Sequence, residues 1–217
     1  MFSAEEDYLK ILYELSHETD SLYVKSSVLA KTFNYTMQSI NEMIKRMAKK
    51  GFVEYVPYKG IKLTTLGKSE ALRLIRAHRV WEVFLAEKLG LPWEALHEEA
   101  EKLEHVTSEE VLNRLYEYLG KPTHCMHGNP IPSAEGFINK NKDQSLWISK
   151  KGWFKITRVI DDKDLLSYLN DLSITINTEI FIDKKDDYAG IIYIKNADEI
   201  HAITKQIAGS IFGLPIN

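Results

Sequence analysis

The segment from residue 26 to residue 65 predicts four short elements in an order that constrains the fold more than any other part of the chain. Two helical patterns, SSVLAKTF and TMQSINEMIKRMAKK, are separated only by Asn34 and Tyr35, which predict a tight corner. Gly51 ends the second pattern behind lysines in its last turn, as is usual at helix C-termini. The run FVEYVPYKGIKLTT then predicts a β-hairpin that turns at YKG. Together with the amphipathic helix SAEEDYLKILYELS before them, these elements have the order of a winged helix-turn-helix.

Downstream of the hairpin the sequence pattern stays helical for about fifty residues. A long helix is predicted from Thr65 to about Ala86, and two more helices from Pro92 to Leu119, divided near Thr107. Such helices behind a DNA-reading module often form a dimer interface. The polar run IPSAEGFINKNKDQS has no periodicity and predicts a linker.

The last third of the chain has a different pattern. The runs GWFKITRVI, TEIFIDKK and GIIYIKN are β-rich, and short helices are predicted at DKDLLSYLND and ADEIHAITKQIAG. This pattern predicts a small β-barrel, so the whole chain is expected to be mainly α with a small β part.

Charge is segregated along the chain although the net charge is only −3. Residues 45–62 carry six basic side chains against a single glutamate, and residues 94–117 carry eight glutamates against one lysine and one arginine. A local basic patch of this kind allows a protein without overall positive charge to bind DNA, whereas the acidic segment suits a cation. No apolar run approaches the roughly 18–20 residues that span a bilayer. The single cysteine fits a reducing compartment, so we expect a cytoplasmic protein without a membrane partner.

The second helix of the corner motif is the predicted recognition helix. Its first turns should face base edges with polar side chains, which are Thr36, Gln38, Ser39, Asn41 and Glu42. Basic side chains farther along the helix and on the hairpin should face phosphates; they are Lys45, Arg46, Lys49, Lys59 and Lys62. The alternative is that these residues are only a polar, lysine-rich solvent face, as many helices have. The corner followed by the YKG hairpin favours the DNA interpretation.

The run HEEAEKLEH places imidazoles and carboxylates on one side of a helix. Residues three and four apart share a helix face, so His97, Glu101, Glu104 and His105 form one stripe. Carboxylates that converge in this way repel one another unless a cation lies between them. The alternative is a solvated acidic face, which is the usual meaning of a glutamate run, but such a face needs no histidines in register.

Two further segments carry donor atoms that suit a metal. AHRVWEV places His78 and Glu82 one helical turn apart, and HCMHGNPIP contains Cys125 and His127 in a C-x-H arrangement. A lone C-x-H is weak evidence, because a buried structural cysteine is common. The run HEEAE also fails as a zincin motif, because Glu101 stands where the second histidine of H-E-x-x-H is required.

The runs DYLKILYEL, AHRVWEVFL, HEEAEKLEHV and HGNPIP, in this order, resemble the diphtheria-toxin-repressor family of metal-dependent regulators, and most closely its manganese-responsive branch. The resemblance covers essentially the whole chain. It implies a winged helix-turn-helix DNA-binding domain, a helical dimerisation and metal-binding domain, a linker and a FeoA-like, SH3-like β-barrel, at residues 1–72, 73–130, 131–147 and 148–217 respectively.

The resemblance also implies two metal sites. One joins the first helix to the E-x-x-E-H pattern through Asp7, Glu101, Glu104 and His105. Oxygen donors at the first two positions suit Mn²⁺, where iron-type relatives have methionine and cysteine. Lys10 stands where short manganese regulators have a glutamate of a binuclear site, so that arrangement is not carried over.

The second implied site combines the long helix, the C-x-H loop and an acidic residue of the barrel. Its residues are His78, Glu82, Cys125, His127 and Asp162, with Asp161 as the alternative to Asp162. His97 is a ligand in some iron-type relatives and is a further candidate.

The function that follows is a repressor of metal-uptake genes, a homodimer on double-stranded operator DNA with Mn²⁺ as corepressor. Fe²⁺ is an alternative because Cys125 tolerates it, and Zn²⁺ is expected to occupy sites in vitro. The rival classes are a winged-helix regulator that senses iron or a small organic ligand, a hydrolytic metalloenzyme and a structural FeoA-like adaptor. Against the metalloenzyme, the sequence shows neither a free base nor an oxyanion element. Against the adaptor, a purely structural role would not need the N-terminal half. We therefore expect neither catalytic residues nor an organic substrate.

Overall fold

The computed structural model describes residues 3–18, 21–139 and 142–216. The chain forms two compact units that interleave in sequence. The first unit contains Met1–Ala77, Glu104–Thr107 and Pro132–Phe137; the second contains His78–Leu103, Ser108–Ile131 and Ile138–Asn217. Among the described residues, none of the helices combines the length and the hydrophobicity that a membrane span requires.

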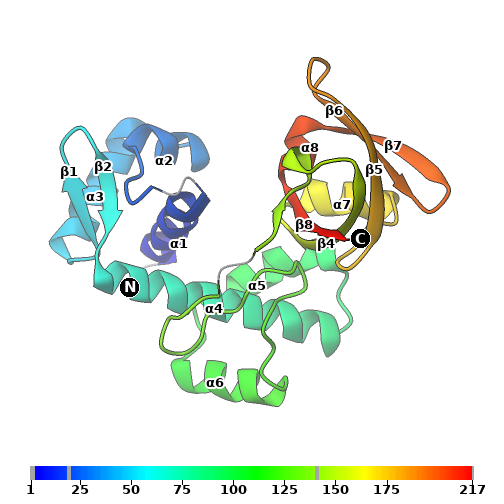
Figure 1. Cartoon of the computed structure of the whole chain (residues 1–217). Helices are drawn as coiled ribbons and strands as arrows, with labels where there is room; N and C mark the ends of the chain where they lie inside the picture. Colours follow the sequence, from blue (N-terminus) through cyan, green and yellow to red (C-terminus); the bar gives the residue numbers. More distant parts are fainter. Residues whose placement is uncertain (1–2, 19–20, 140–141, 217) are drawn as a thin grey trace. The chain divides into compact units, whose positions relative to one another are not determined.

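The first unit contains the predicted winged helix-turn-helix (Figure 1). Its elements are α1 (Ser3–Glu18), α2 (Ser26–Thr32), α3 (Met37–Lys49), β1 (Val53–Val56), β2 (Gly60–Leu63) and the start of α4 (Thr65–Glu87). Asn34 makes the corner between α2 and α3 with a φ of 53°, and the Thr36 hydroxyl caps α3 by accepting from the Ser39 N–H at 3.2 Å. The buried faces of α1, α2 and α3 pack with the hairpin and α4 into one core.

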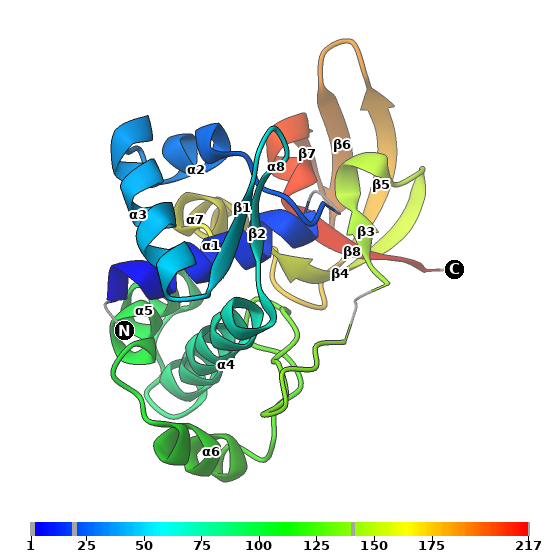
Figure 2. The same cartoon turned by 90° about the vertical axis from the view of Figure 1, so that its left-hand side faces the viewer.

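The hairpin pairs β1 and β2 antiparallel and is extended by an isolated bridge between Val24 and Ile61. Figure 2 shows the two strands side by side, followed directly by α4. Gly60 is required at the turn, because its φ is +125° and an added Cβ would lie 2.5 Å from the Val24 carbonyl oxygen. The predicted YKG turn is therefore confirmed, and it is fixed by a close backbone approach.

The second unit combines helices with an antiparallel sheet. Its helical elements are the rest of α4, η1 (Trp93–Ala95), α5 (Leu96–Glu104, which ends in the first unit) and α6 (Glu109–Tyr118). Its sheet has the order β3-β8-β4-β5-β6-β7. The strands are β3 (Gln144–Ser145), β4 (Gly152–Val159), β5 (Glu179–Asp186), β6 (Ile191–Asn196), β7 (Glu199–Thr204) and β8 (Ile211–Ile216). The short helices are η2 (Leu146–Ile148), α7 (Lys163–Asp171) and α8 (Lys205–Gly209).

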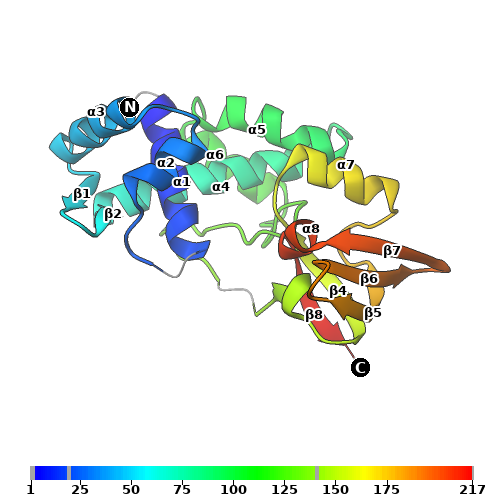
Figure 3. The same cartoon turned by 90° about the horizontal axis from the view of Figure 1, so that it is seen from above.

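Bulges bend this sheet, since the register shifts between Ile156 and Arg158 in β4 and between Ile182 and Lys184 in β5. Figure 3 shows α7 lying along the strands, where its leucines join the isoleucines of the sheet in a single core. The fold therefore agrees with the predicted class, with helical modules followed by a small β domain.

One predicted helix is only partly confirmed, because a helix covers just its last five residues, 205–209. The run ADEIHAITKQIAG forms the turn after β6, strand β7 and the short helix α8. Ala197 has a φ of 52° in a tight turn between β6 and β7, and the β-branched Ile200, Ile203 and Thr204 then pair along β6. The predicted linker 131–147 also contains β3 and the start of η2, while its residues 140 and 141 lie outside the described part.

Candidate metal centres

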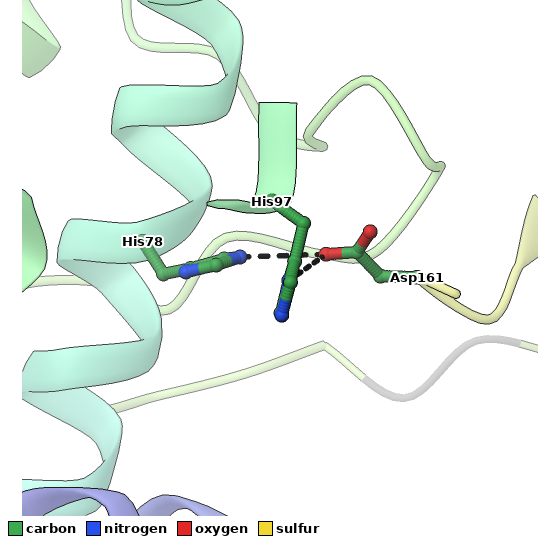
Figure 4. Close-up of side chains that lie close together, drawn as sticks. All are labelled: His78, His97 and Asp161. Carbon is green, nitrogen blue, oxygen red and sulfur yellow. Dashed lines mark hydrogen bonds and ion pairs between the residues drawn. The ribbon is translucent and has the colours of Figure 1, made fainter. Parts of the chain in front are cut away.

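A cluster of six donor side chains lies inside the second unit. Figure 4 shows part of it: His78 from α4 and His97 from α5 both point to one oxygen of Asp161. Asp161 Oδ2 lies 3.4 Å from His78 Nε2 and 2.7 Å from His97 Nδ1. Asp161 belongs to the short loop between β4 and α7, so the β domain and the helices meet at this point within the unit.

The remaining members of the cluster are Glu82, one turn after His78 on α4, and the C-x-H loop residues Cys125 and His127. His127 Nδ1 lies 2.9 Å from Glu82 Oε1, and His127 Nε2 lies 3.1 Å from the Trp93 carbonyl oxygen. Cys125 is buried with them.

Backbone contacts hold the C-x-H loop against β4. The Val159 N–H donates to the His127 carbonyl at 3.0 Å. Gly128 has a φ of +80°, and any Cβ at this position would collide with the Thr157 carbonyl. These contacts fix β4 against the loop. Asp161, two residues after the end of β4, therefore lies beside His127.

The ionisation of the cluster is strongly coupled. Burial works against the charged form of Glu82, but the neighbouring His78 and His127 outweigh it and hold the Glu82 pKa well below its ordinary value. Burial likewise opposes the charge on Asp161, whose pKa is lowered by hydrogen bonds from His78 and His97. Hydrogen bonding to Asp161 raises the pKa of His97.

The pKa of His127 is also strongly shifted. Burial lowers its pKa, but hydrogen bonds to Cys125 and Glu82 and the charge of Asp161 raise it to about 11. Burial, together with the charge of Glu82, raises the pKa of the Cys125 thiol. In the metal-free protein, protons on imidazoles therefore balance the buried carboxylates.

The cluster fits a metal ion. Two carboxylate oxygens in it, Glu82 Oε2 and Asp161 Oδ1, are buried and have no hydrogen-bond partner among the described residues. A buried carboxylate oxygen without a donor is costly, and a cation would satisfy it. The imidazole, carboxylate and thiol donors are those that bind first-row transition ions.

Metal binding by this cluster is expected to depend steeply on pH. His127 and Cys125 must each lose a proton to bind an ion, and both are protonated at neutral pH because their pKa values are raised. The apparent Mn²⁺ affinity should rise at least about tenfold for each pH unit between pH 6 and 8, because at least one proton leaves per ion. Calorimetry in buffers of different ionisation enthalpy counts the protons. An affinity that is constant over this range would contradict the proton competition.

The structure places Asp161, rather than the predicted Asp162, in the cluster. Asp162 is the N-cap of α7, and its Oδ1 accepts from the Leu165 N–H at 2.9 Å. The Asp162 carboxylate is thus used in the helix cap, and the neighbouring Asp161 contacts the histidines.

The adjacent aspartates should therefore behave differently when replaced. Asp162→Ala should lower the free energy of unfolding by roughly 0.5–2 kcal/mol, as for a lost N-cap, and leave Mn²⁺ binding by the second unit unchanged. Asp161→Ala should weaken that binding by at least tenfold, because it removes a donor. Chemical unfolding and equilibrium dialysis of both variants test this pair. An Asp162→Ala protein that loses as much metal as Asp161→Ala would reject the assignment.

A second cluster lies in the first unit. His105 Nε2 lies 3.1 Å from Asp7 Oδ1 and 3.8 Å from Glu104 Oε1. Asp7 comes from α1, in the winged-helix module, and Glu104 is the last residue of α5. Oxygen and nitrogen atoms of the three side chains converge within 4.8 Å of one another, close enough for one ion.

Two residues that were not predicted as part of this site contact its side chains. Glu6 Oε2 lies 2.7 Å from His105 Nδ1 and orients the ring. Lys10 Nζ donates to both Glu104 oxygens, at 3.1 and 3.0 Å, and the Glu104 side chain is fully buried. The proximity of Lys10 to the site could have been predicted from spacing, because Lys10 is three residues after Asp7 and shares its helix face.

Glu101 is the predicted ligand that the structure does not bring into this cluster. It belongs to the second unit and is about half exposed, and its Oε2 lies 3.7 Å from His97 Nε2. The predicted stripe therefore divides, with Glu104 and His105 in one cluster and His97 in the other.

The predicted DNA-facing residues of α3 are all exposed, as a recognition helix requires. Gln38 donates to Glu42 at 3.2 Å, so the two side chains are held side by side. Arg46 Nε lies 3.1 Å from Glu5 of α1, which partly neutralises it. On the hairpin, Lys59 is exposed and Lys62 is half-buried.

Comparison with known families covers most of the chain. Residues 1–61 match the family described as iron dependent repressor, N-terminal DNA binding domain. Residues 64–133 match iron dependent repressor, metal binding and dimerisation domain, and residues 149–214 match the FeoA domain.

Individual relatives agree with these matches. The iron-dependent repressor IdeR of Mycobacterium leprae is 27% identical over 212 residues, which cover 90% of each chain. A solved structure of a manganese-dependent transcriptional repressor in complex with manganese is 29% identical with a TM-score of 0.87, covering 98% of this chain and 100% of that one. The structure of the manganese regulator SloR is 32% identical with a TM-score of 0.85, covering 98% of both chains. The chain therefore belongs to the iron-dependent repressor family, which includes the diphtheria toxin repressors, and is a metal-dependent DNA-binding transcriptional repressor rather than an enzyme.

Proposed function

We propose that this protein represses metal-uptake genes in the cytoplasm and that Mn²⁺ is its corepressor. The observation that carries the proposal is the cluster of Asp7, Glu104 and His105. Its donors are oxygen and nitrogen only, which suits Mn²⁺ better than softer ions. Two of the solved structures that the chain resembles are named as manganese regulators, which agrees with this choice.

An ion in this cluster would join two parts of the first unit. Asp7 lies on α1, whose apolar face packs in the winged-helix core, whereas Glu104 and His105 follow the helices of the dimerisation region. Glu101, one turn before Glu104 and His105, remains a proposed fourth ligand. An ion held by both parts would restrain the recognition helix α3 relative to that region.

The protein would act as a homodimer on double-stranded operator DNA. Two recognition helices must be about 34 Å apart to enter successive major grooves, so restraining each of them favours binding. In α3, Thr36, Gln38, Ser39, Asn41 and Glu42 would face bases, while Lys45 and Arg46, with Lys59 and Lys62 of the hairpin, would face phosphates. A coupling of this kind is typically about 1–3 kcal/mol, or roughly 5–150-fold in DNA affinity.

The second-unit cluster leaves the choice of metal more open. His78, Glu82, Cys125, His127 and Asp161 would hold an ion there, and a thiolate also accepts Fe²⁺ or Zn²⁺. An iron-responsive repressor is thus the second candidate function, and Cys125 is the residue that favours it.

The experiment is a titration of chelated protein with Mn²⁺, Fe²⁺ or Zn²⁺, with binding to the promoter of a manganese-uptake gene as the readout. The proposal predicts half-maximal DNA binding within the free Mn²⁺ concentrations of a cell, and repression that is relieved when Mn²⁺ is withdrawn. Activation by Fe²⁺ at physiological concentrations, without activation by Mn²⁺, would assign the protein to iron. Binding that ignores every metal would reject both candidates.

A further inference from the structure

We propose that the second-unit cluster binds two adjacent divalent cations, bridged by the carboxylates of Glu82 and Asp161. This inference rests on the proposed metal-responsive function and deepens it. It assigns a separate ion position to His78 and His97, next to the position formed by Cys125 and His127.

The donor atoms fall into two groups. One triad is Glu82, Cys125 and His127, and the other is His78, His97 and Asp161; within each, one donor atom per residue lies within 4.8 Å of the others. Donor atoms on one ion are separated by at most twice the metal–ligand bond length, or about 4–4.6 Å for bonds of about 2.0–2.3 Å. Each triad is therefore about the size of one ion's coordination sphere.

The two carboxylates each reach both triads. Glu82 Oε1 lies 2.9 Å from His127 Nδ1 and 3.3 Å from His78 Nε2. Asp161 directs Oδ2 to His78 and His97, while its Oδ1 lies 3.6 Å from His127 Nδ1. Asp161 thus has one oxygen toward each triad, and Glu82 Oε1 lies near an imidazole of each, so both carboxylates are placed to bridge neighbouring cations.

Unsatisfied oxygens support the same arrangement. Glu82 is almost fully buried, and its Oε2 has no hydrogen-bond partner among the described residues; nor has Asp161 Oδ1. Each bridging carboxylate therefore has one oxygen that contacts imidazole and one buried oxygen that is still without a hydrogen-bond donor. A pair of ions would use all four oxygens.

The two positions differ in chemistry. The thiol of Cys125 makes the first position softer, whereas the second offers only imidazole nitrogen and carboxylate oxygen. Soft ions should therefore fill the Cys125 position first, and Mn²⁺ should fill both. The simpler alternative is a single ion held by His78, Glu82, Cys125, His127 and Asp161, with His97 serving only as a hydrogen-bond partner of Asp161.

The test uses the full-length chain with Asp7→Ala and His105→Ala together, which remove two of the three donors of the first-unit cluster so that it no longer holds an ion. It compares His97→Ala with Cys125→Ser in that background. His97 is about one-third exposed, so its replacement should not disturb the core, and His97→Gln serves as a second, bulkier variant. Circular dichroism verifies the fold of each variant before metal is added.

We expect two Mn²⁺ per chain in the background protein and one in each further variant, by equilibrium dialysis with elemental analysis. Two ions bridged at about 3.5–4 Å should also give an exchange-coupled Mn²⁺ electron paramagnetic resonance spectrum, which both variants lose. With Co²⁺, the thiolate charge-transfer band should persist in His97→Ala and disappear in Cys125→Ser.

One uncoupled Mn²⁺ per chain, unaffected by His97→Ala and His97→Gln, would overturn the inference in favour of the single-ion site. The proposed function is judged separately by DNA binding. A coupled ion pair with DNA binding that ignores metal would retain the inference and reject the function. Metal-dependent DNA binding with a single ion in the second-unit cluster would retain the function and reject the inference.

Discussion

Asp7→Ala should remove most of the metal-dependent gain in operator affinity, which is expected to be roughly 5–150-fold in the unaltered protein. The Asp7 carboxylate is the contribution of α1 to the cluster, 3.1 Å from His105 Nε2. Without it, an ion bound to Glu104 and His105 no longer holds the winged-helix module. DNA affinity without metal should be unchanged, because Asp7 does not lie on α3.

Fluorescence anisotropy with labelled promoter DNA, with and without Mn²⁺, measures this gain directly. Glu109→Ala is the matched control, because it removes one carboxylate from an exposed helix start outside both clusters. It should keep the full gain. An Asp7→Ala protein that also keeps it would show that the first-unit cluster does not transmit the metal signal.

Lys10→Met should destabilise the metal-free protein by roughly 3–5 kcal/mol, the range for removing one partner of a buried ion pair. Lys10 donates to both oxygens of Glu104, which is fully buried and would be left without this ammonium. Mn²⁺ should then stabilise the variant more than the unaltered protein, because the ion no longer competes with Lys10 for Glu104. Urea unfolding of both proteins, each with and without Mn²⁺, gives the four free energies that are needed.

Lys102→Met is the control for this prediction. Lys102 is also paired with a glutamate, Glu99, at 2.7 Å, but both side chains are exposed on α5. Its replacement should leave stability and the response to Mn²⁺ unchanged. If Lys10→Met and Lys102→Met had equal free energies of unfolding without metal, the ion pair between Lys10 and Glu104 would not contribute to stability.

Local patterns in the sequence account for most of the fold. The helices up to Tyr118 and the hairpin at Gly60 were predictable because capping residues, apolar spacing and glycine act over a few neighbouring positions. The strand β7 was not predicted, since the segment 199–204 is extended because it pairs with β6. This is the usual way in which tertiary contacts override local propensity.

The candidate sites show the same division. His78 and Glu82 lie one turn apart on one helix, so their proximity followed from spacing alone. The choice between Asp161 and Asp162 depended on where α7 begins, and a helix boundary is uncertain by a residue or more from sequence. The contact between Lys10 and Glu104 joins residues 94 positions apart, which one sequence does not reveal.

The most direct test of metal as corepressor is reciprocity between the two ligands. Mn²⁺ affinity should be measured by calorimetry with and without saturating promoter DNA, and DNA affinity with and without saturating Mn²⁺. We expect DNA to tighten Mn²⁺ binding by the same factor by which Mn²⁺ tightens DNA binding, once all bound ions are counted. If Mn²⁺ binds equally well with and without DNA, the metal does not control operator binding.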